Sequence, residues 1–295
     1  MVGEPESVLQ TVTECTSKAL ELIDMRLHSG EHARMGAVDV VPFIPIKGVS
    51  MEECIDLSNR YAKLVSDEHS LPVFLYANSA RYPSRVRLPD IRQGEYEGLQ
   101  EKIQSPDWKP DFGPAKFQPT MGATATGARN FLIAYNVNLN TANKSKANTI
   151  ASKIRTSGIV VKDDNGETVR DKNGIVLRIP GIFEKLQAAG WMYNEDIAQV
   201  SMNLLDYSVT GLHDVTEAIK LEASKLGLEA VAGELVGLVP LQAIMDAGNH
   251  YSDTNIQDVD SLVENAIEGL MLDRLESFDP FENIIEWAIE REKNE

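Results

Sequence analysis

Two histidines near the N-terminus, His28 and His32, have a spacing that could support chemistry. The string that joins them, H-S-G-E-H, matches the H-x-x-E-H signature of inverted zinc proteases. In that signature both histidines bind zinc from one face of a helix, and the glutamate acts as general base. Gly30 lies inside the string and Gly36 follows it. We therefore expect the helix to end near His28 and the zinc site not to form.

A histidine in this segment could instead act as a general acid and base. An imidazole with a pKa of about 6.5 takes up and releases protons at neutral pH. Loops between a helix and a buried strand often present catalytic groups. The alternative is a solvated histidine without a role. The remaining histidines, His69, His213 and His250, fall at the ends of predicted helices, where capping or surface exposure is expected.

A glycine-rich run and a group of cations lie further along the chain. The run from Gly122 to Arg129 is neither a P-loop nor a dinucleotide fingerprint. It suits a close approach of the backbone to a flat or anionic ligand before a strand, and an ordinary tight loop is the alternative. Residues 81–92 contain one acid, Asp90, and four arginines, which are Arg81, Arg85, Arg87 and Arg92. This local excess of positive charge predicts an anion site.

The composition excludes several classes of protein. The 295 residues include 28 Lys+Arg and 45 Asp+Glu, and the net charge of −17 disfavours nonspecific binding to nucleic acid or anionic membranes. The sequence contains no run of about 18 consecutive apolar residues, so it predicts no membrane-spanning helix. The N-terminus is acidic, whereas a signal peptide begins with basic residues followed by an apolar run. Two cysteines, Cys15 and Cys54, make no disulfide framework. We expect a cytoplasmic protein.

The elements that position these residues alternate between helix and strand, which favours layered α/β structure. Ser50 and Glu53 form a predicted capping box at the start of the second helix. Asn-Gly pairs at Asn165 and Asn173 predict an exposed hairpin over residues 159–178. Helices are expected at 5–27, 50–70, 143–154, 182–190 and 213–226 and in the acidic C-terminal region, and strands at 38–46, 71–77, 131–139, 197–206 and 228–233.

Six strings in a fixed order carry a family resemblance. They are IDMRLHSGEHARMGAVDVVPFIP (23–45), LPDIRQGEYEGL (88–99), PDFGP (110–114), GATATGARNFLIAYNVNL (122–139), AQVSMNLLD (198–206) and ELVGLVPL (234–241). Together they resemble the glutamate formimidoyltransferase family, the folate-dependent enzymes of histidine breakdown. The resemblance extends from Val2 to about Glu290.

The resemblance implies an α/β (α+β) fold of two similar layered subdomains, residues 1–131 and 132–295. Helices would pack on mainly antiparallel or mixed sheets, with an electropositive ligand groove between the subdomains, and the assembly would be a homodimer. Family members also begin with a further N-terminal segment of strands and a helix, and Met1 aligns with its end. Without that segment, we expect the sheet of the first subdomain to have an open edge. We also expect the ligand groove to lack the part that the segment would form.

The resemblance also implies the site residues. The catalytic histidine of the family falls on His32, in a string where Ala33 replaces the usual proline. The folate-contacting stretch falls on Gly113, Pro114, Ala115, Lys116, Phe117, Gln118, Pro119, Thr120, Met121 and Gly122. The implied reaction moves a formimino group from N-formimino-L-glutamate to N5 of tetrahydrofolate, a co-substrate, without a metal.

Roles for individual residues follow as hypotheses. His32 would shuttle the protons of the transfer. Arg129, Arg34 or Lys116 would hold substrate carboxylates, and Asp39 would either balance a cationic carbon or have a buried structural role. Two alternatives stay open: formyl instead of formimino transfer, and a truncated, non-catalytic folate-binding or partner protein.

Overall fold

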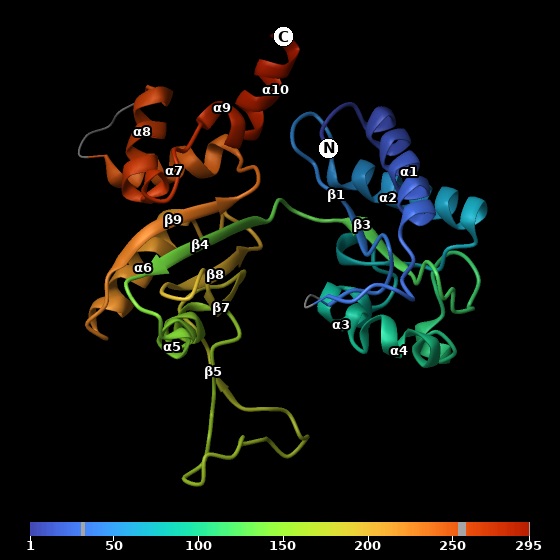
Figure 1. The fold of residues 1–295 in the computed structure, drawn as a ribbon, viewed down its shortest axis with the longest axis horizontal. Helices are drawn as coiled ribbons and strands as arrows, with labels where there is room; N and C mark the ends of the chain where they lie inside the picture. Colours follow the sequence, from blue (N-terminus) through green and yellow to red (C-terminus); the bar gives the residue numbers. More distant parts are fainter. Residues whose placement is uncertain (31–32, 253–257, 295) are drawn as a thin grey trace. The chain divides into compact units, whose positions relative to one another are not determined.

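The computed structural model describes residues 1–30, 33–252 and 258–294 of the chain. The chain folds as two compact units, Met1–Asn130 and Phe131–Glu295, and each unit combines a sheet with helices (Figure 1). This confirms the expected α/β fold class. None of the described helices is long and apolar enough to cross a membrane. The ligand groove between subdomains stays a prediction.

The first unit is built on a three-stranded parallel sheet in the order β1 (Val40–Phe43), β3 (Thr124–Ala128) and β2 (Val73–Leu75). Side chains of the long helices α1 (Pro5–Leu22) and α2 (Met51–His69) form a core with one face of this sheet. Side chains of the short helices α3 (Leu88–Arg92) and α4 (Glu95–Lys102) form a core with the other face. Parallel strands are usually covered on both faces in this way.

The glycine-rich run that was expected to be a loop is the central strand of this sheet. All five residues of β3 are buried, and both of its neighbours pair with it in parallel. A Cβ at Gly127 would lie 2.1 Å from the carbonyl oxygen of Tyr76. The small side chains therefore serve close strand packing, and the expectation of a loop is wrong for residues 124–128.

The first helix is shorter than its apolar pattern predicts, because it ends at Leu22 and not at residue 27. The carboxylate of Asp24 accepts a hydrogen bond from the backbone N–H of Arg26 at 3.0 Å and thereby forms a turn. The backbone N–H of Met25 leaves the helical pattern and donates to the carbonyl oxygen of Thr120 at 2.9 Å. A distant partner thus competes with the helix for this backbone group.

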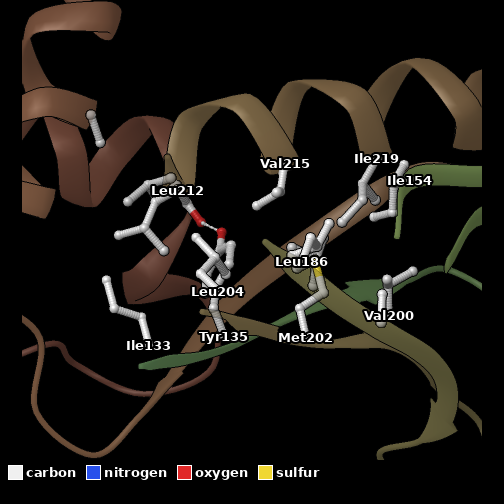
Figure 2. Close-up of a cluster of buried hydrophobic side chains, with 14 of the residues drawn as sticks. Ile133, Tyr135, Ile154, Leu186, Val200, Met202, Leu204, Leu212, Val215 and Ile219 are labelled. Carbon is white, nitrogen blue, oxygen red and sulfur yellow. Dashed lines mark hydrogen bonds between the residues drawn. The ribbon is translucent and has the colours of Figure 1, made fainter. Parts of the chain in front are cut away.

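The second unit is built on an antiparallel sheet in the order β7 (Leu186–Met192), β8 (Ala198–Leu204), β4 (Ile133–Leu139) and β9 (Ala230–Val236). The helices α5 (Lys144–Ile154) and α6 (Leu212–Ser224) pack on one face. Leu212, Val215 and Ile219 of α6 meet the side chains of the strands there (Figure 2). The hydroxyls of Tyr135 and Thr216 join by a 3.0 Å hydrogen bond inside this core.

The helix expected at 182–190 is absent from the structure, and strand β7 covers most of that segment. Burial alternates along β7, with Leu186, Ala188 and Gly190 buried and the residues between them exposed. This period of two is typical of a strand. A Cβ at Gly190 would lie 2.3 Å from the backbone nitrogen of Asn148 in α5, so the glycine allows helix and strand to touch.

The exposed hairpin over 159–178 is confirmed as a β-arm. Strands β5 (Ile159–Val160) and β6 (Arg178–Ile179) form its base, and bridges at Lys162–Thr168 and Arg170–Val176 extend it. The arm extends away from the sheet of its unit (Figure 1). The chain closes with α7 (Leu241–Tyr251), α8 (Val259–Gly269), α9 (Pro280–Asn283) and α10 (Ile285–Asn294).

Candidate functional site

The segment around the histidine motif is joined by its backbone to the predicted folate-contacting stretch. The N–H of Ala37 donates to the carbonyl oxygen of Met121 at 2.9 Å, and the N–H of Ala123 donates to that of Met35 at 3.1 Å. A third bond, from Met25 to Thr120, lies on the other side of the motif. Two segments that are about 90 residues apart in sequence thus lie side by side within the first unit.

Two glycines make this close contact possible. Gly122 has a φ of +71°, and a Cβ there would lie 2.1 Å from the carbonyl oxygen of Met35. Gly36 faces it, and its Cβ would lie 2.3 Å from the carbonyl oxygen of Ala123. Side chains cannot be accommodated at such distances without backbone movement. Gly36 and Gly122 are therefore required at this junction, because a side chain at either position would clash with the backbone of the other segment.

The predicted catalytic residue His32, together with Glu31, lies outside the described residues. Its described neighbours are His28, which is exposed, and Arg34, which is half-buried. Within residues 1–30, 33–252 and 258–294, no group of three or more His, Cys, Asp or Glu side chains could hold a metal. Because the zinc-like string includes both residues outside this part, its metal-binding reading stays open to experiment.

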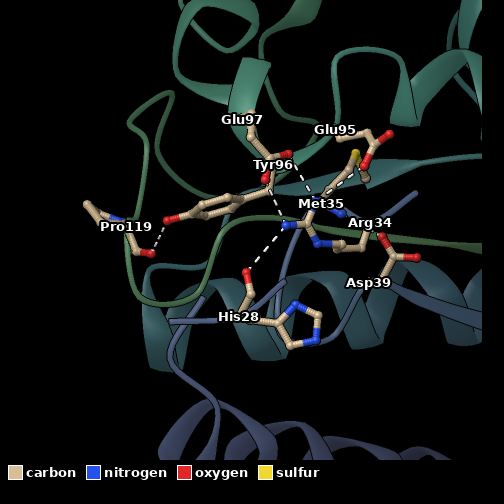
Figure 3. Close-up of polar contacts among 8 residues, drawn as sticks. All are labelled: His28, Arg34, Met35, Asp39, Glu95, Tyr96, Glu97 and Pro119. Carbon is tan, nitrogen blue, oxygen red and sulfur yellow. Dashed lines mark hydrogen bonds and ion pairs between the residues drawn. The ribbon is translucent and has the colours of Figure 1, made fainter. Parts of the chain in front are cut away.

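Arg34 ties the motif to helix α4 (Figure 3). Its guanidinium donates to the carboxylate of Glu97 at 2.7 and 3.0 Å and to that of Glu95 at 3.2 Å. It also donates to the carbonyl oxygen of His28 at 3.5 Å. The bonds with Glu97 raise the pKa of Arg34 and lower that of Glu97. Arg34 thus pairs with two carboxylates of α4 and also contacts the backbone of His28, at the start of the motif.

The first turn of α4 supplies residues that sequence reasoning did not single out. Besides Glu95 and Glu97, Tyr96 donates its hydroxyl hydrogen to the carbonyl oxygen of Pro119 and packs its ring 5.4 Å from that of Phe117. Burial, and then the negative charge of Asp24, raise the pKa of Tyr96. The three residues were part of the quoted string at 88–99, but only the fold shows that they meet the motif.

The motif and α4 border a shallow, open hollow of about 460 Å³ within the first unit. Its lining combines small residues with charged ones: Ser29, Gly30, Arg34, Gly94, Glu95 and Glu97. Glu95 has a left-handed φ of +54°, a conformation that costs a non-glycine residue about 1–2 kcal/mol. Such strain is frequent at functional sites, and here it aims a carboxylate at Arg34.

Asp39 is held on the adjoining side of the motif. One oxygen of its carboxylate accepts from the backbone N–H of Met35 at 2.8 Å, and the other pairs with the guanidinium of Arg92. The same carboxylate therefore fixes the residue after Arg34. This arrangement favours the structural role over direct contact with a cationic carbon.

Two of the four arginines at 81–92, the segment whose charge predicts an anion site, are paired inside the first unit. Arg85 is 1% exposed, and it donates to the carboxylate of Asp111 at 2.7 Å and to the carbonyl oxygens of Asp107 and Lys109. Arg92 pairs with Asp39. These two guanidinium groups are used inside the unit, because carboxylates distant in sequence fold against them.

The predicted folate-contacting stretch is anchored at its ends and open in its middle. Gly113 has a φ of +79°, and a Cβ there would lie 2.3 Å from the carbonyl oxygen of Leu71. Gly122 anchors the other end as described above. Ala115 and Lys116 between them are exposed, and no carboxylate of the described part lies within ion-pair distance of Lys116. Lys116 is thus a cation of this site that is available to an anion.

Comparison with protein families gives two adjoining matches. Residues 1–129 match the model of the formiminotransferase domain, N-terminal subdomain, and residues 134–290 match that of the formiminotransferase domain. Together these matches cover nearly the whole chain.

Comparison with individual proteins gives relatives of two lengths. The formimidoyltransferase-cyclodeaminase of Rattus norvegicus is 44% identical over 292 residues, which are 98% of this chain and 51% of the relative. The chain thus spans about half the length of such relatives. The glutamate formimidoyltransferase of Streptococcus pyogenes is 37% identical over 91% of this chain and 83% of the relative. That of Thermoplasma acidophilum is 40% identical over 85% and 76%.

Proposed function

This chain belongs to the formiminotransferase family, and on that premise we propose that it is a glutamate formimidoyltransferase. The name is that of the Streptococcus pyogenes and Thermoplasma acidophilum relatives. The observation that carries the proposal is the backbone junction between the histidine motif and the stretch Gly113–Gly122. The junction joins, within one unit, the two segments to which the family resemblance assigns catalysis and folate contact.

In the proposed reaction, N5 of tetrahydrofolate attacks the formimino carbon of N-formimino-L-glutamate. A bond forms between N5 and this carbon, the tetrahedral intermediate collapses, and the bond from the carbon to the glutamate nitrogen breaks. N5 loses a proton and the leaving nitrogen gains one. We assign both transfers to the imidazole of His32, because a group that titrates near neutrality can serve as base and then as acid.

We assign the remaining roles to other residues of the first unit. Residues Gly113–Gly122 contact tetrahydrofolate, which is a co-substrate, and the exposed ammonium of Lys116 pairs with a substrate carboxylate. Arg34 positions the motif through Glu95 and Glu97 and is not itself a carboxylate ligand. The chemistry assigned here uses these side chains and no metal.

We further propose a homodimer and a cytoplasmic location. The family resemblance suggests the dimer, and the two free cysteines, Cys15 and Cys54, suit a reducing compartment. Light scattering coupled to size-exclusion chromatography measures the mass: about twice the 32.6 kDa of the chain supports the dimer, and a mass equal to it rejects it.

Replacement of His32 tests the proposed function directly. His32→Ala should lower kcat for formimino transfer by about 10²–10⁴-fold, the usual contribution of a general acid and base. His28→Ala is the matched control, because His28 lies in the same motif, is exposed and has no assigned proton transfer. It should keep kcat within about threefold. A loss below tenfold in His32→Ala, or an equal loss in both variants, would reject the assignment.

A further inference from the structure

The first turn of α4 contacts both segments that the proposed function joins. Glu95 and Glu97 in this turn accept hydrogen bonds from Arg34 of the histidine motif. Tyr96 lies between them in sequence, and its side chain extends instead to Pro119 of the proposed folate-contacting stretch (Figure 3). Neighbouring residues of one helical turn thus contact two different segments of the first unit.

The backbone just before Tyr96 has an unusual conformation. Gly94 and Glu95 both have a left-handed φ, of +88° and +54° respectively. A non-glycine residue keeps this conformation only where the surrounding contacts stabilise it. The hydrogen bonds of Glu95, Tyr96 and Glu97 with distant segments supply such contacts. The start of α4 is therefore fixed by the segments that it contacts.

Tyr96 makes two separate contacts with the stretch. Its hydroxyl donates to the carbonyl oxygen of Pro119 at 2.5 Å, and its ring lies 5.4 Å from that of Phe117. Burial raises the pKa of Tyr96, so the hydroxyl keeps its hydrogen at neutral pH and acts as the donor. A single hydrogen bond or aromatic pair of this kind changes an equilibrium constant by about two- to tenfold.

The middle of the stretch depends on side chains for its position. Within the described residues, the backbone groups of residues 115–117 make no hydrogen bond. Phe117 is half-buried, and it packs against the core beside α3 and α4 as well as against Tyr96. Lys116, which precedes it, is exposed. The position of this ammonium group therefore follows that of Phe117, because no backbone hydrogen bond fixes the chain there.

We propose that Tyr96 is a positioning residue for folate binding, which holds Pro119 through its hydroxyl and Phe117 through its ring. It thereby presents the stretch, with Lys116, to tetrahydrofolate. The inference rests on the proposed function and adds to it a residue from outside Gly113–Gly122. Because the histidine motif contacts α4 through other side chains, loss of the tyrosine hydroxyl should affect folate affinity and not the transfer step.

Two substitutions separate the hydroxyl of Tyr96 from its ring. Tyr96→Phe removes the hydrogen bond to Pro119 and keeps the ring, and Tyr96→Leu removes both contacts. Tyr82→Phe is the matched control, because Tyr82 is 53% exposed in the same unit and its hydroxyl has no hydrogen-bond partner among the described residues. Titration calorimetry measures the Kd for 5-formyltetrahydrofolate, and steady-state kinetics give kcat and the KM for each substrate. Thermal unfolding of each variant is measured alongside.

We expect Tyr96→Phe to raise the Kd for 5-formyltetrahydrofolate and the KM for tetrahydrofolate by about three- to tenfold, and Tyr96→Leu by about tenfold or more. In Tyr96→Phe, kcat and the KM for N-formimino-L-glutamate should change by less than about threefold. Tyr82→Phe should keep every constant within about twofold. A merely structural tyrosine would instead change both KM values together with the melting temperature.

The proposal is overturned if Tyr96→Phe binds the folate within twofold of the wild type, if the wild-type chain binds no folate, or if Tyr96→Phe raises both KM values equally. Turnover separates these results from a failure of the proposed function. A chain without turnover whose folate binding still depends on Tyr96 retains this inference and loses the proposed function. A chain with turnover whose folate binding ignores Tyr96→Phe retains the function and loses this inference.

Discussion

Arg34 shows how a charged side chain of the motif can act without touching a substrate. Its guanidinium is occupied by Glu95 and Glu97 and reaches the backbone of His28. An arginine that is 13% exposed and shared by two carboxylates is poorly placed to bind a third. Its contribution at the residue scale is to fix the segment that contains the proposed catalytic histidine.

The pair of Arg85 and Asp111 has a similar structural role next to the start of the proposed folate-contacting stretch. Both side chains are almost fully buried, at 1% and 2% exposure. The carboxylate also accepts from the backbone N–H of Leu75 at 2.9 Å and thus closes the edge of β2. The PDFGP string therefore fixes the start of the stretch through its aspartate.

Replacement of Asp111 should destabilise the first unit severely. Asp111→Ala leaves the buried guanidinium of Arg85 without its anion, which costs about 3–5 kcal/mol of unfolding free energy. Asp90→Ala is the control, because Asp90 and Arg87 are 4.0 Å apart and exposed, and it should cost less than about 1 kcal/mol. Urea unfolding measures both, and similar midpoints for the two variants would contradict the structural role of the buried pair.

The sequence could not reveal which arginines are available. Arg85 and Arg87 look alike in a pattern of charges, but one is buried and the other is exposed. The difference arises because Asp111, 26 residues further along, folds against Arg85. Charge counting predicts an excess of cations, and only the tertiary structure shows how many of them are already paired.

At the scale of elements, the junction between the histidine motif and the proposed folate-contacting stretch depends on glycine. Gly122→Ala should cost about 3 kcal/mol or more, because a left-handed φ of +71° and a contact at 2.1 Å combine there. Gly48→Ala is a matched control: its φ is +70°, but a Cβ there meets nothing within 4 Å. It should cost only the conformational share, about 1–2 kcal/mol.

Two measurements check this prediction. Chemical unfolding gives the free-energy difference between the two alanine variants, and turnover shows whether the junction supports catalysis. We expect Gly122→Ala to lose far more activity than Gly48→Ala under conditions in which both are folded. Equal losses of stability would mean that the backbone contact at Gly122 is easily relieved. The claim that the junction requires a glycine at this position would then be wrong.

Removal of the β-arm should leave the second unit almost unchanged. A variant that lacks residues 161–177, with Val160 joined to Arg178 by an Asn-Gly turn, keeps the pairing of β5 and β6. Ile175 in the arm is 63% exposed, so little core is lost, and the melting temperature should shift by less than about 3 °C. Calorimetry measures this. A larger drop, or a loss of activity, would give the arm a role in folding or in the site.

Local signals predicted some elements well and others poorly. The capping box at Ser50 is confirmed by hydrogen bonds in both directions with Glu53, because both groups lie within one turn. The error over 182–190 has a different origin. Strand β7 contains Ala188 and Ala189, which suit helices, and pairing with β8 along its whole length outweighs that local preference.

At the scale of the whole molecule, the charge of −17 disfavours anionic ligands in general. The proposed substrates nevertheless have negatively charged carboxylates. Their carboxylates require the few available cations, such as the exposed Lys116.

The family was predictable from the order of six short strings, and the matches over 1–129 and 134–290 agree with it. The hydrogen bonds between the histidine motif and the stretch Gly113–Gly122 could not be predicted. No local pattern indicates that the N–H of Ala123 donates to the carbonyl oxygen of Met35.

The most direct test of the account follows one nitrogen atom. The chain is incubated with tetrahydrofolate and N-formimino-L-glutamate that carries ¹⁵N in its imino group, and mass spectrometry detects the folate product. The account predicts a tetrahydrofolate derivative that carries both the transferred carbon and the ¹⁵N label. A formyl product without the label, or no product from the folded chain, would contradict formimino transfer as the function of this chain.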